Sequence, residues 1–207
     1  MKIVNLDGYT TNPGDLSWDW LGNYGEYKVY DRTAPEQIVE RAKGADILII
    51  NKSVITAQML ENLPNLKFVG LQSTGYNVID CKAARARNIT VSNIPAYSTT
   101  GVAQLVFAFI LQVADNVSLH SDAVHNGEWC ECPDFCFWKT PLTELDGKTI
   151  GIIGFGSIGR RVAQIANAFG MNVEVFTTHP KPDEYKNVNF VDFDTLLSDS
   201  DFITCHC

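Results

Sequence analysis

The chain has 207 residues, of which 45% are hydrophobic, 11% aromatic and 19% charged. Because a domain occupies roughly 150 residues on average, we expect one or two domains with a sizeable core, and the composition argues against a disordered or fibrous chain. Sixteen Lys and Arg residues against 24 Asp and Glu give a formal net charge of −8, which argues against general affinity for nucleic acid or an anionic membrane. With no membrane-length apolar run and no secretory signal, a cytoplasmic location is expected.

The first half of the chain alternates short apolar runs with helical patterns, which is typical of βα units and a mainly parallel sheet. Thr33, followed by Pro35 and Glu36, predicts the start of a helix that runs toward Gly44. Asp80 is a candidate cap for a helix over residues 81–87. We therefore expect one α/β domain in residues 1–97, with strands over residues 2–6, 27–30, 46–50, 67–71 and 90–92.

A long helix is expected next, capped within Ser98-Thr99-Thr100, running to about Asn126 and extending on the order of 40 Å. Its first half, residues 102–113, is apolar nearly all round and must be covered, which predicts a subunit or domain interface. An irregular loop follows over residues 127–142. Its aromatic side chains are too many to leave in water; they are Trp129, Phe135, Phe137 and Trp138.

The βα rhythm resumes in the last third of the chain, where strands are predicted over residues 149–153, 172–176 and 201–205. Helices are predicted over residues 158–169 and 194–197. A doubly wound nucleotide-binding sheet has six strands in its usual form, and three are predicted here. The sequence therefore favours the first half of such a domain, in a truncated piece of a longer protein.

A glycine motif connects the first of these strands to its helix: Gly154-Phe155-Gly156-Ser157-Ile158-Gly159 matches G-x-G-x-x-G. Gly154 permits the tight turn, Gly156 lets a pyrophosphate approach the backbone, and Gly159 lets helix and strand pack. Free N–H groups at the helix start then bind phosphate oxygens. The alternative is a glycine-rich turn without a ligand.

The dinucleotide fingerprint also expects an acidic residue at the tip of the second strand, to hold the adenosine ribose. That position falls at Thr177, and the nearest carboxylate, Glu174, lies in mid-strand. With His179 and Lys181 close by, either NAD or NADP is a candidate cofactor. Pro180 and Pro182 fit the competing interpretation, a solvated turn.

Four further segments make a family resemblance specific. They are residues 71–80, residues 93–98 with 102–104, residues 145–149, and residues 196–201 leading to 206–207. With the glycine motif they resemble the D-isomer-specific 2-hydroxyacid dehydrogenase family, and most closely its hydroxypyruvate reductase or glycerate dehydrogenase branch. The resemblance implies a flavodoxin-like substrate domain in residues 1–97. It implies a dimerisation helix, an arm loop and the first half of a doubly wound Rossmann NAD(P)-binding domain in residues 98–207. The implied protein is a homodimeric oxidoreductase that interconverts hydroxypyruvate or glyoxylate with D-glycerate or glycolate.

The same resemblance assigns residues to the substrate. Backbone amides of Thr74 and Gly75, in the loop that begins at Ser73, are implied to grip the substrate carboxylate, and successive N–H groups after a strand can form such an anion site. Lys52 either adds positive charge to the mouth of the site or is a surface lysine. Trp138 either reaches toward the partner subunit's site or packs only in the dimer contact.

On the cofactor side, the resemblance places Val102 near the nicotinamide, and His206 and Cys207 along the adenosine. It also implies that the family's catalytic Arg, Glu and His lie further along than Cys207. No catalytic residue is therefore expected within these 207 residues, and the fragment alone is expected to be inactive.

Two alternatives remain open from the sequence. Cys130, Cys132 and Cys136, with Glu131, could in principle bind zinc, but their spacing fits no common zinc knuckle, so we expect thiols and no metal. A dinucleotide-sensing, corepressor-like binding protein could also use this fold, since fold alone does not fix function. An enzyme that uses S-adenosylmethionine is disfavoured by the full glycine motif.

Overall fold

The computed structural model describes residues 1–207, which form two compact units, Met1–Tyr97 and Ser98–Cys207. No single helix is long and apolar enough to cross a membrane; helices α4 (Thr99–Asp115) and α5 (Val117–His125) reach that length only as a pair, bent by 63°.

The first unit is built on five parallel strands in the order β2-β1-β3-β4-β5. This is the flavodoxin-like order 2-1-3-4-5, which confirms the predicted fold of this part. All five predicted strands are present, each within one residue at either end; they are β1 (Lys2–Asn5), β2 (Glu26–Val29), β3 (Ile47–Ile50), β4 (Phe68–Leu71) and β5 (Thr90–Ser92).

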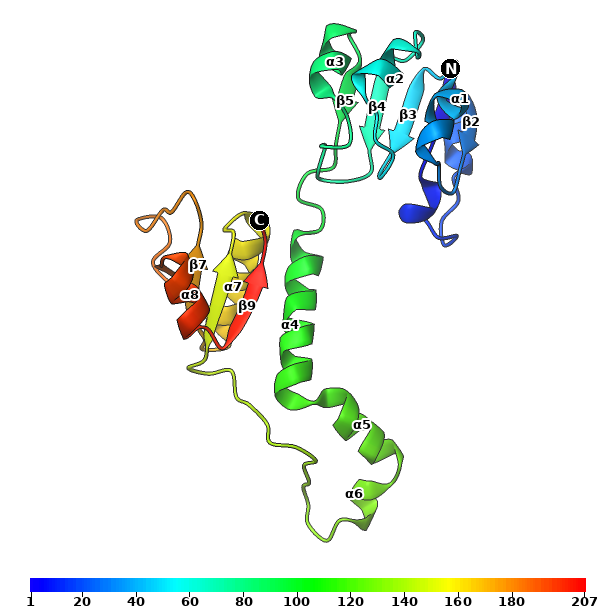
Figure 1. Ribbon diagram of the computed structural model, residues 1–207. Coiled ribbons are helices and arrows are strands. Elements are labelled where there is room, and N and C mark those ends of the chain that lie inside the picture. Colours follow the sequence, from blue (N-terminus) through cyan, green and yellow to red (C-terminus); the bar gives the residue numbers. More distant parts are fainter. The chain divides into compact units, whose positions relative to one another are not determined.

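Short helices cover the sheet of this unit (Figure 1). Leu48, Ile50 and Val69 are completely buried in a core that also contains Ile38 and Leu60 from the helices. A parallel sheet needs apolar cover of this kind. The helices are α1 (Ile38–Ala42), α2 (Ala57–Glu61) and α3 (Cys81–Ala86), with 3₁₀ turns over Gly8–Thr10, Asp19–Asn23 and Pro35–Gln37.

One predicted helix cap, Asp80, is confirmed and two are wrong. Ser98 stands at the start of α4, but no side-chain hydrogen bond caps that helix. The Asp80 carboxylate accepts hydrogen bonds from the N–H groups of Lys82 and Ala83 at the start of α3. Thr33, by contrast, does not cap its helix: its hydroxyl donates to the carbonyl of Leu6 at 2.8 Å. The 3₁₀ turn therefore begins without a side-chain cap, because Thr33 is used to attach the chain to the first strand.

The second unit contains four parallel strands in the order β8-β7-β6-β9, which is the 3-2-1-4 part of a doubly wound sheet. Three of them were predicted. The fourth, β8 (Asn189–Phe190), has only two residues and so leaves no apolar run in the sequence. The others are β6 (Thr149–Ile153), β7 (Asn172–Phe176) and β9 (Phe202–Cys205).

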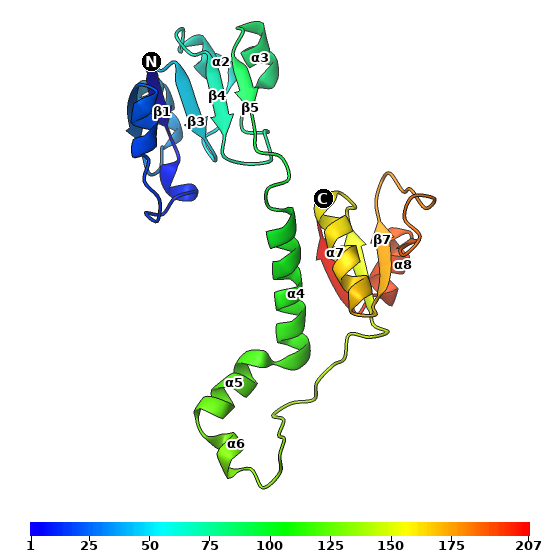
Figure 2. The same cartoon turned by 180° about the vertical axis from the view of Figure 1, so that it is seen from behind.

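Helices cover both faces of this second sheet. Helix α7 (Ser157–Ala168) lies on one face and α8 (Phe193–Asp199) on the other, as Figures 1 and 2 show from opposite sides. A Cβ added at Gly151 would meet Leu196 of α8. This close approach explains why glycine occupies the middle of β6.

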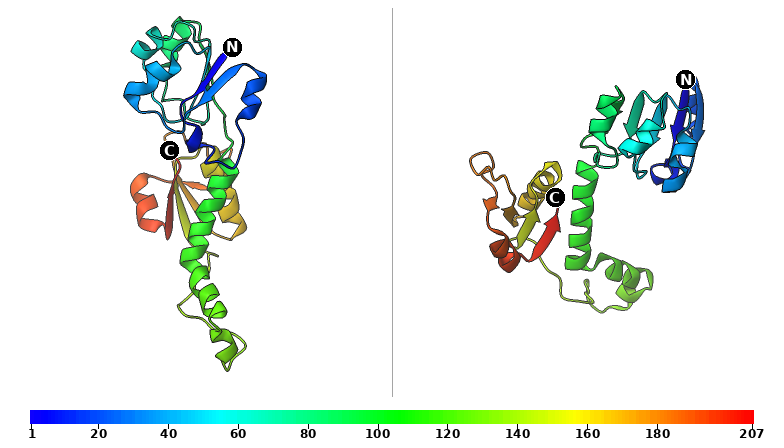
Figure 3. Two further views of the ribbon diagram at one scale, coloured as in Figure 1. Left: turned by 90° about the vertical axis from the view of Figure 1, so that its right-hand side faces the viewer. Right: turned by 45° about the horizontal axis from the view of Figure 1, so that its top comes forward.

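Helix α4 packs along α7, with Phe107 stacked on Phe169 at a ring separation of 5.4 Å. The single 40 Å helix of the prediction is wrong, because the chain breaks at Asn116. Asn116 is in the left-handed region (φ 49°), its N–H donates to the carbonyl of Gln112, and its side-chain amide donates to Thr140. The resulting turn into α5 is visible in green in Figure 3.

The predicted irregular loop after α5 contains one short helix, α6 (Glu128–Glu131). Its aromatic side chains were expected to be covered, and within one chain this is wrong. Trp129 is 49% exposed, Trp138 is 69% exposed and Phe135 is 91% exposed. These large apolar groups are therefore not part of a core within this chain.

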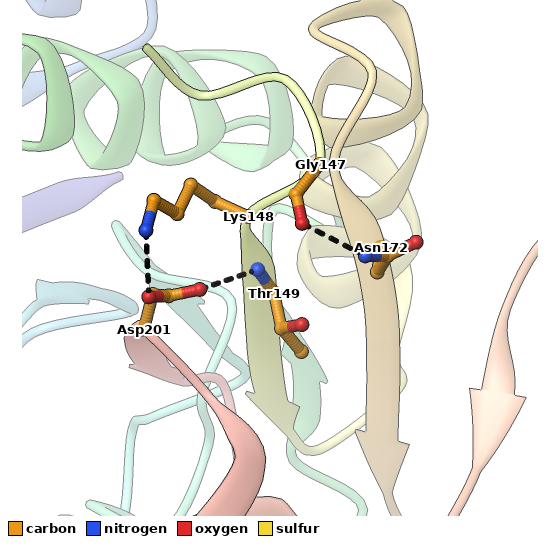
Figure 4. Close-up of polar contacts among 5 residues, drawn as sticks. All are labelled: Gly147, Lys148, Thr149, Asn172 and Asp201. Carbon is orange, nitrogen blue, oxygen red and sulfur yellow. Dashed lines mark hydrogen bonds and ion pairs between the residues drawn. The ribbon is translucent and has the colours of Figure 1, made fainter. Parts of the chain in front are cut away.

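The edge of the second sheet where its strands begin is held by side chains (Figure 4). The Asp201 carboxylate accepts from the N–H of Thr149 at 2.9 Å and pairs with Lys148 at 3.3 Å. The Asn172 amide donates to the carbonyl of Gly147 at 3.0 Å. The hydrogen bond from Thr149, assisted by Lys148, lowers the pKa of Asp201 below its ordinary value.

Replacing Asp201 with asparagine should therefore lower the free energy of unfolding at pH 7 and lower it less at pH 3. A carboxyl whose pKa is lowered by folding contributes stability above its unfolded pKa, near 3.8, and that contribution is lost as the pH falls through the folded value. Urea unfolding at both pH values measures this, with the exposed Asp183→Asn as a matched control. An equal loss at pH 3 and pH 7 would show that the charge plays no part.

Candidate dinucleotide site and substrate loop

The turn between β6 and α7 has the backbone geometry that its glycines predict. Gly154 is in the left-handed region (φ 90°), and its N–H donates to the carbonyl of Phe176 at 2.9 Å. A Cβ at Gly154 would lie 2.6 Å from the carbonyl oxygen of His206, and a Cβ at the buried Gly159 would overlap the carbonyl oxygen of Gly154. Both positions therefore exclude any larger residue.

Gly156 differs from these two because it faces open space. No atom lies within 4 Å of the position that its Cβ would take, and Gly156 itself precedes the first turn of α7. The N–H groups of Ser157 and Ile158 lie in that first turn, where no carbonyl of the helix can accept from them. The arrangement provides room and free donors at a helix start, which suits a pyrophosphate.

A cavity of about 280 Å³ lies beside this turn. Thr177, at the end of β7, lines it together with His179 and Lys181 of the following loop. Arg160 also lines it, from α7, and its guanidinium donates to the carbonyl of Phe155 at 3.3 Å. The motif reading missed Arg160, although the residue directly after the third glycine lies in the first turns of the helix and is a natural candidate.

Glu174, the alternative carboxylate for the ribose, does not line this cavity. Its side chain is half-buried in mid-strand, and one carboxylate oxygen has no hydrogen-bond partner. Burial, together with the negative charge of Asp199 of α8, raises the pKa of Glu174. The chain therefore supplies no acidic side chain at the tip of β7.

His206 and Cys207 follow β9 and run beside the glycine turn. The N–H of His206 donates to the carbonyl of Ile153 at 2.7 Å, and its Nε2 lies 2.9 Å from the hydroxyl of Thr204. Burial lowers the pKa of His206. Val102 is half-buried near the start of α4 and does not line the cavity.

The loop after β4 in the first unit is fixed by its own side chains. The Ser73 hydroxyl donates to the carbonyl of Gly75 at 2.8 Å, and the Thr74 hydroxyl donates to the carbonyl of Ile94 at 3.0 Å. The Asn93 amide in turn donates to the carbonyl of Thr74 at 2.7 Å. The backbone N–H groups of Thr74 and Gly75 make no hydrogen bond within the chain, so they are free to bind an anion.

A buried carboxylate organises the neighbouring loop, which follows β3. Asp7 is only 4% exposed, and one of its oxygens accepts from three consecutive N–H groups, those of Asn51, Lys52 and Ser53, at 2.8–3.0 Å. The Ser53 hydroxyl donates to the other oxygen at 2.9 Å. Asp7 thereby fixes the backbone that carries the exposed Lys52. Sequence reasoning missed Asp7, because its partners lie more than forty positions away.

The cysteines of the arm are not grouped as metal ligands in this structure. The Cys132 thiol donates to the carbonyl of Cys136 at 3.6 Å, and no group of three His, Cys, Asp or Glu side chains in the chain is placed to hold a metal ion. All six cysteines are unpaired. Trp138 lies exposed on the same arm and does not line the dinucleotide cavity.

The family model of the D-isomer specific 2-hydroxyacid dehydrogenase catalytic domain matches residues 10–202. All of this chain aligns with the hydroxypyruvate reductase of Blautia hydrogenotrophica, at 46% identity over 211 residues and 66% of that protein. The glycerate dehydrogenase of Methylorubrum extorquens is 38% identical over 182 residues, which are 87% of this chain and 56% of that protein. The chain thus spans about two thirds or less of these curated relatives.

Solved structures of similar proteins have the same fold as this chain over its whole length. The acyclic imino acid reductase Bsp5, in complex with NADPH and D-Arg, superposes with a TM-score of 0.77 at 32% identity, covering all of this chain and 65% of that one. The D-lactate dehydrogenase from Aquifex aeolicus, complexed with NAD and lactic acid, gives 0.76 at 27% identity, with 100% and 60% covered. With the family match over residues 10–202, these findings show that the chain belongs to the D-isomer specific 2-hydroxyacid dehydrogenase family.

Proposed function

We propose that this chain is part of an oxidoreductase that transfers a hydride between NAD(P)H and a small 2-oxo acid. The substrates proposed are hydroxypyruvate and glyoxylate, which would give D-glycerate and glycolate. The observation that carries the proposal is the turn at Gly154–Gly159, with open space at Gly156 and free N–H groups at the start of α7. The names of the similar relatives, hydroxypyruvate reductase and glycerate dehydrogenase, support the substrate class.

The residues around the glycine turn fit a nicotinamide dinucleotide, which supplies the hydride when it is bound. Gly156, Ser157 and Ile158 hold the pyrophosphate through backbone N–H groups. Thr177 contacts the adenosine ribose, and Phe155, His206 and Cys207 line the adenosine side. Val102 is proposed to pack near the nicotinamide.

On the substrate side, the free N–H groups of Thr74 and Gly75 bind the substrate carboxylate. Ser73 holds this loop through its bond to the carbonyl of Gly75. Lys52, on the loop fixed by Asp7, adds positive charge that favours an anionic substrate. Trp138 is proposed to reach the site of a partner subunit, since it is exposed on its own chain.

None of the four histidines is proposed as the general acid. Each ring is engaged with its own helix or turn: His120 with the carbonyl of Asn116, His125 with that of Ser121, His179 with the Thr178 hydroxyl, and His206 with the Thr204 hydroxyl. We therefore propose that the 207-residue polypeptide binds dinucleotide without turnover. Its unpaired cysteines support a reducing, cytoplasmic location, and the exposed apolar face of α4 supports a homodimer.

Two polypeptides test this proposal. The first is the 207-residue chain, verified by intact mass. The second is a chimera in which the rest of the Blautia hydroxypyruvate reductase follows residue 207. We expect both to bind NADH or NADPH, and only the chimera to oxidise it with hydroxypyruvate or glyoxylate. Turnover by the 207-residue chain would contradict the proposed inactivity. Binding without turnover by a folded chimera would contradict the enzyme and favour a dinucleotide sensor.

A further inference from the structure

Three basic side chains from two separate elements surround the cavity at the end of β7. Arg160 comes from α7, whereas His179 and Lys181 come from the loop that follows β7. Phe155 and Tyr185 form an apolar wall of the same cavity, with their rings edge to face at 5.1 Å. An opening of about 280 Å³ with this lining suits a compact anion held next to an aromatic group.

Two acidic side chains, Glu174 and Glu184, lie near this cavity, and neither of them lines it. Burial raises the pKa of the Glu174 carboxyl, which disfavours its charge. Glu184 is exposed and pairs with Lys181 at 2.9 Å. This pair is solvated and therefore weak, so a doubly charged phosphate can replace Glu184 as the partner of Lys181.

We propose that this cavity binds the 2′-phosphate of NADPH and that Arg160 and Lys181 make the chain prefer NADPH over NADH. The inference rests on the proposed dinucleotide function. A carboxylate at the tip of the second strand would accept hydrogen bonds from the ribose hydroxyls of NAD and repel a 2′-phosphate, whereas a nearby arginine accommodates that phosphate. Here the tip is Thr177, whose hydroxyl can donate to a phosphate oxygen, and Arg160 supplies the fixed positive charge.

Two adenosine nucleotides separate this inference from the proposed function. Adenosine 2′,5′-bisphosphate and 5′-AMP share the base, the ribose and the 5′-phosphate, and differ only at the 2′ position. Titrated calorimetrically into the 207-residue chain, the bisphosphate is expected to bind at least tenfold more tightly. Arg160→Gln and Lys181→Gln should each reduce this preference about fivefold and leave the affinity for 5′-AMP within about twofold.

Two further variants make the test specific. Lys186→Gln removes the same charge from the same loop, at a residue that lines only a neighbouring cavity, and should leave the preference unchanged. Glu184→Gln frees Lys181 and should strengthen binding of the bisphosphate, a gain that a merely structural role would not produce. If both nucleotides bind equally, or 5′-AMP binds better, the inference is wrong while the proposed function stands. If neither binds to folded protein, the proposed function itself fails.

Discussion

The Gly156→Ala variant is expected to lose dinucleotide affinity at least tenfold and to keep its free energy of unfolding within about 1 kcal/mol of the original chain. No atom lies within 4 Å of the added methyl group, and the backbone at Gly156 (φ −74°) is one that alanine adopts readily. The methyl group would occupy the space proposed for the pyrophosphate. Titration with NADPH and urea unfolding measure the two quantities on the same sample.

Gly159→Ala makes the same substitution at a position where the added methyl group has no room. Its added methyl group would overlap the carbonyl oxygen of Gly154 and press on Ile152 of β6. We therefore expect this variant to lose about 1–3 kcal/mol of stability, the usual cost of overpacking a tight contact. Unchanged dinucleotide affinity in Gly156→Ala would place the pyrophosphate elsewhere, and unchanged stability in Gly159→Ala would contradict the helix–strand packing.

The second large effect is expected on the assembly of the chain. Phe107 and Ile110 of α4 are buried against α7, whereas Leu105, Phe109 and Val113, spaced four residues apart, are 52%, 64% and 70% exposed. Residues spaced by four share one face of a helix. An apolar stripe of this length needs a partner, and a second copy of the chain is the partner we propose.

Phe109→Glu should convert the proposed dimer into a monomer. An aromatic side chain at the centre of an interface contributes about 2 kcal/mol or more, and an unpaired buried carboxylate adds a further penalty. Sedimentation velocity over a range of concentrations measures the dissociation constant, which should rise at least thirtyfold. Gln58→Glu, an exposed site on α2 of the first unit, makes the same change of charge as a control. A dimer that survives Phe109→Glu would place the interface elsewhere.

The features that could be predicted from the sequence depend on local patterns. The strands of the first unit are predicted from short apolar runs. The glycine turn is predicted from three glycines whose spacing allows a tight turn after the strand, the approach of a pyrophosphate and the packing of the helix on the strand. Asp80 was predicted as a cap because its partners, Lys82 and Ala83, lie within three residues of it. Local chemistry of this kind is readable without knowing the fold.

The features that were missed depend on contacts between distant residues. The long predicted helix is broken at Asn116, whose side-chain amide donates a hydrogen bond to the distant Thr140. Thr33 does not cap the predicted helix, because its hydroxyl donates to the carbonyl of Leu6 instead. Asp7 has no recognisable role until the fold brings the loop after β3 to it. Each of these outcomes reflects tertiary structure overriding a local preference.

One part of the candidate site could be predicted from a local motif, and another part depends on the tertiary fold. The glycine motif identifies the phosphate end of the dinucleotide, because the function depends on the backbone of one turn. Arg160 lines the same cavity as Thr177 because the fold brings the first turn of α7 close to the end of β7. The sequence therefore predicts that a dinucleotide binds, and the choice between NADH and NADPH becomes a structural question.

The most direct test of the central claim, that the turn at Gly154–Gly159 holds a dinucleotide, is a ¹⁵N–¹H NMR titration of the 207-residue chain with NADPH. The account predicts saturable shifts of the amide signals of Gly156, Ser157 and Ile158, whose N–H groups make no hydrogen bond within the chain at the start of α7. Saturable shifts confined to other residues, or no shifts in folded protein, would contradict it.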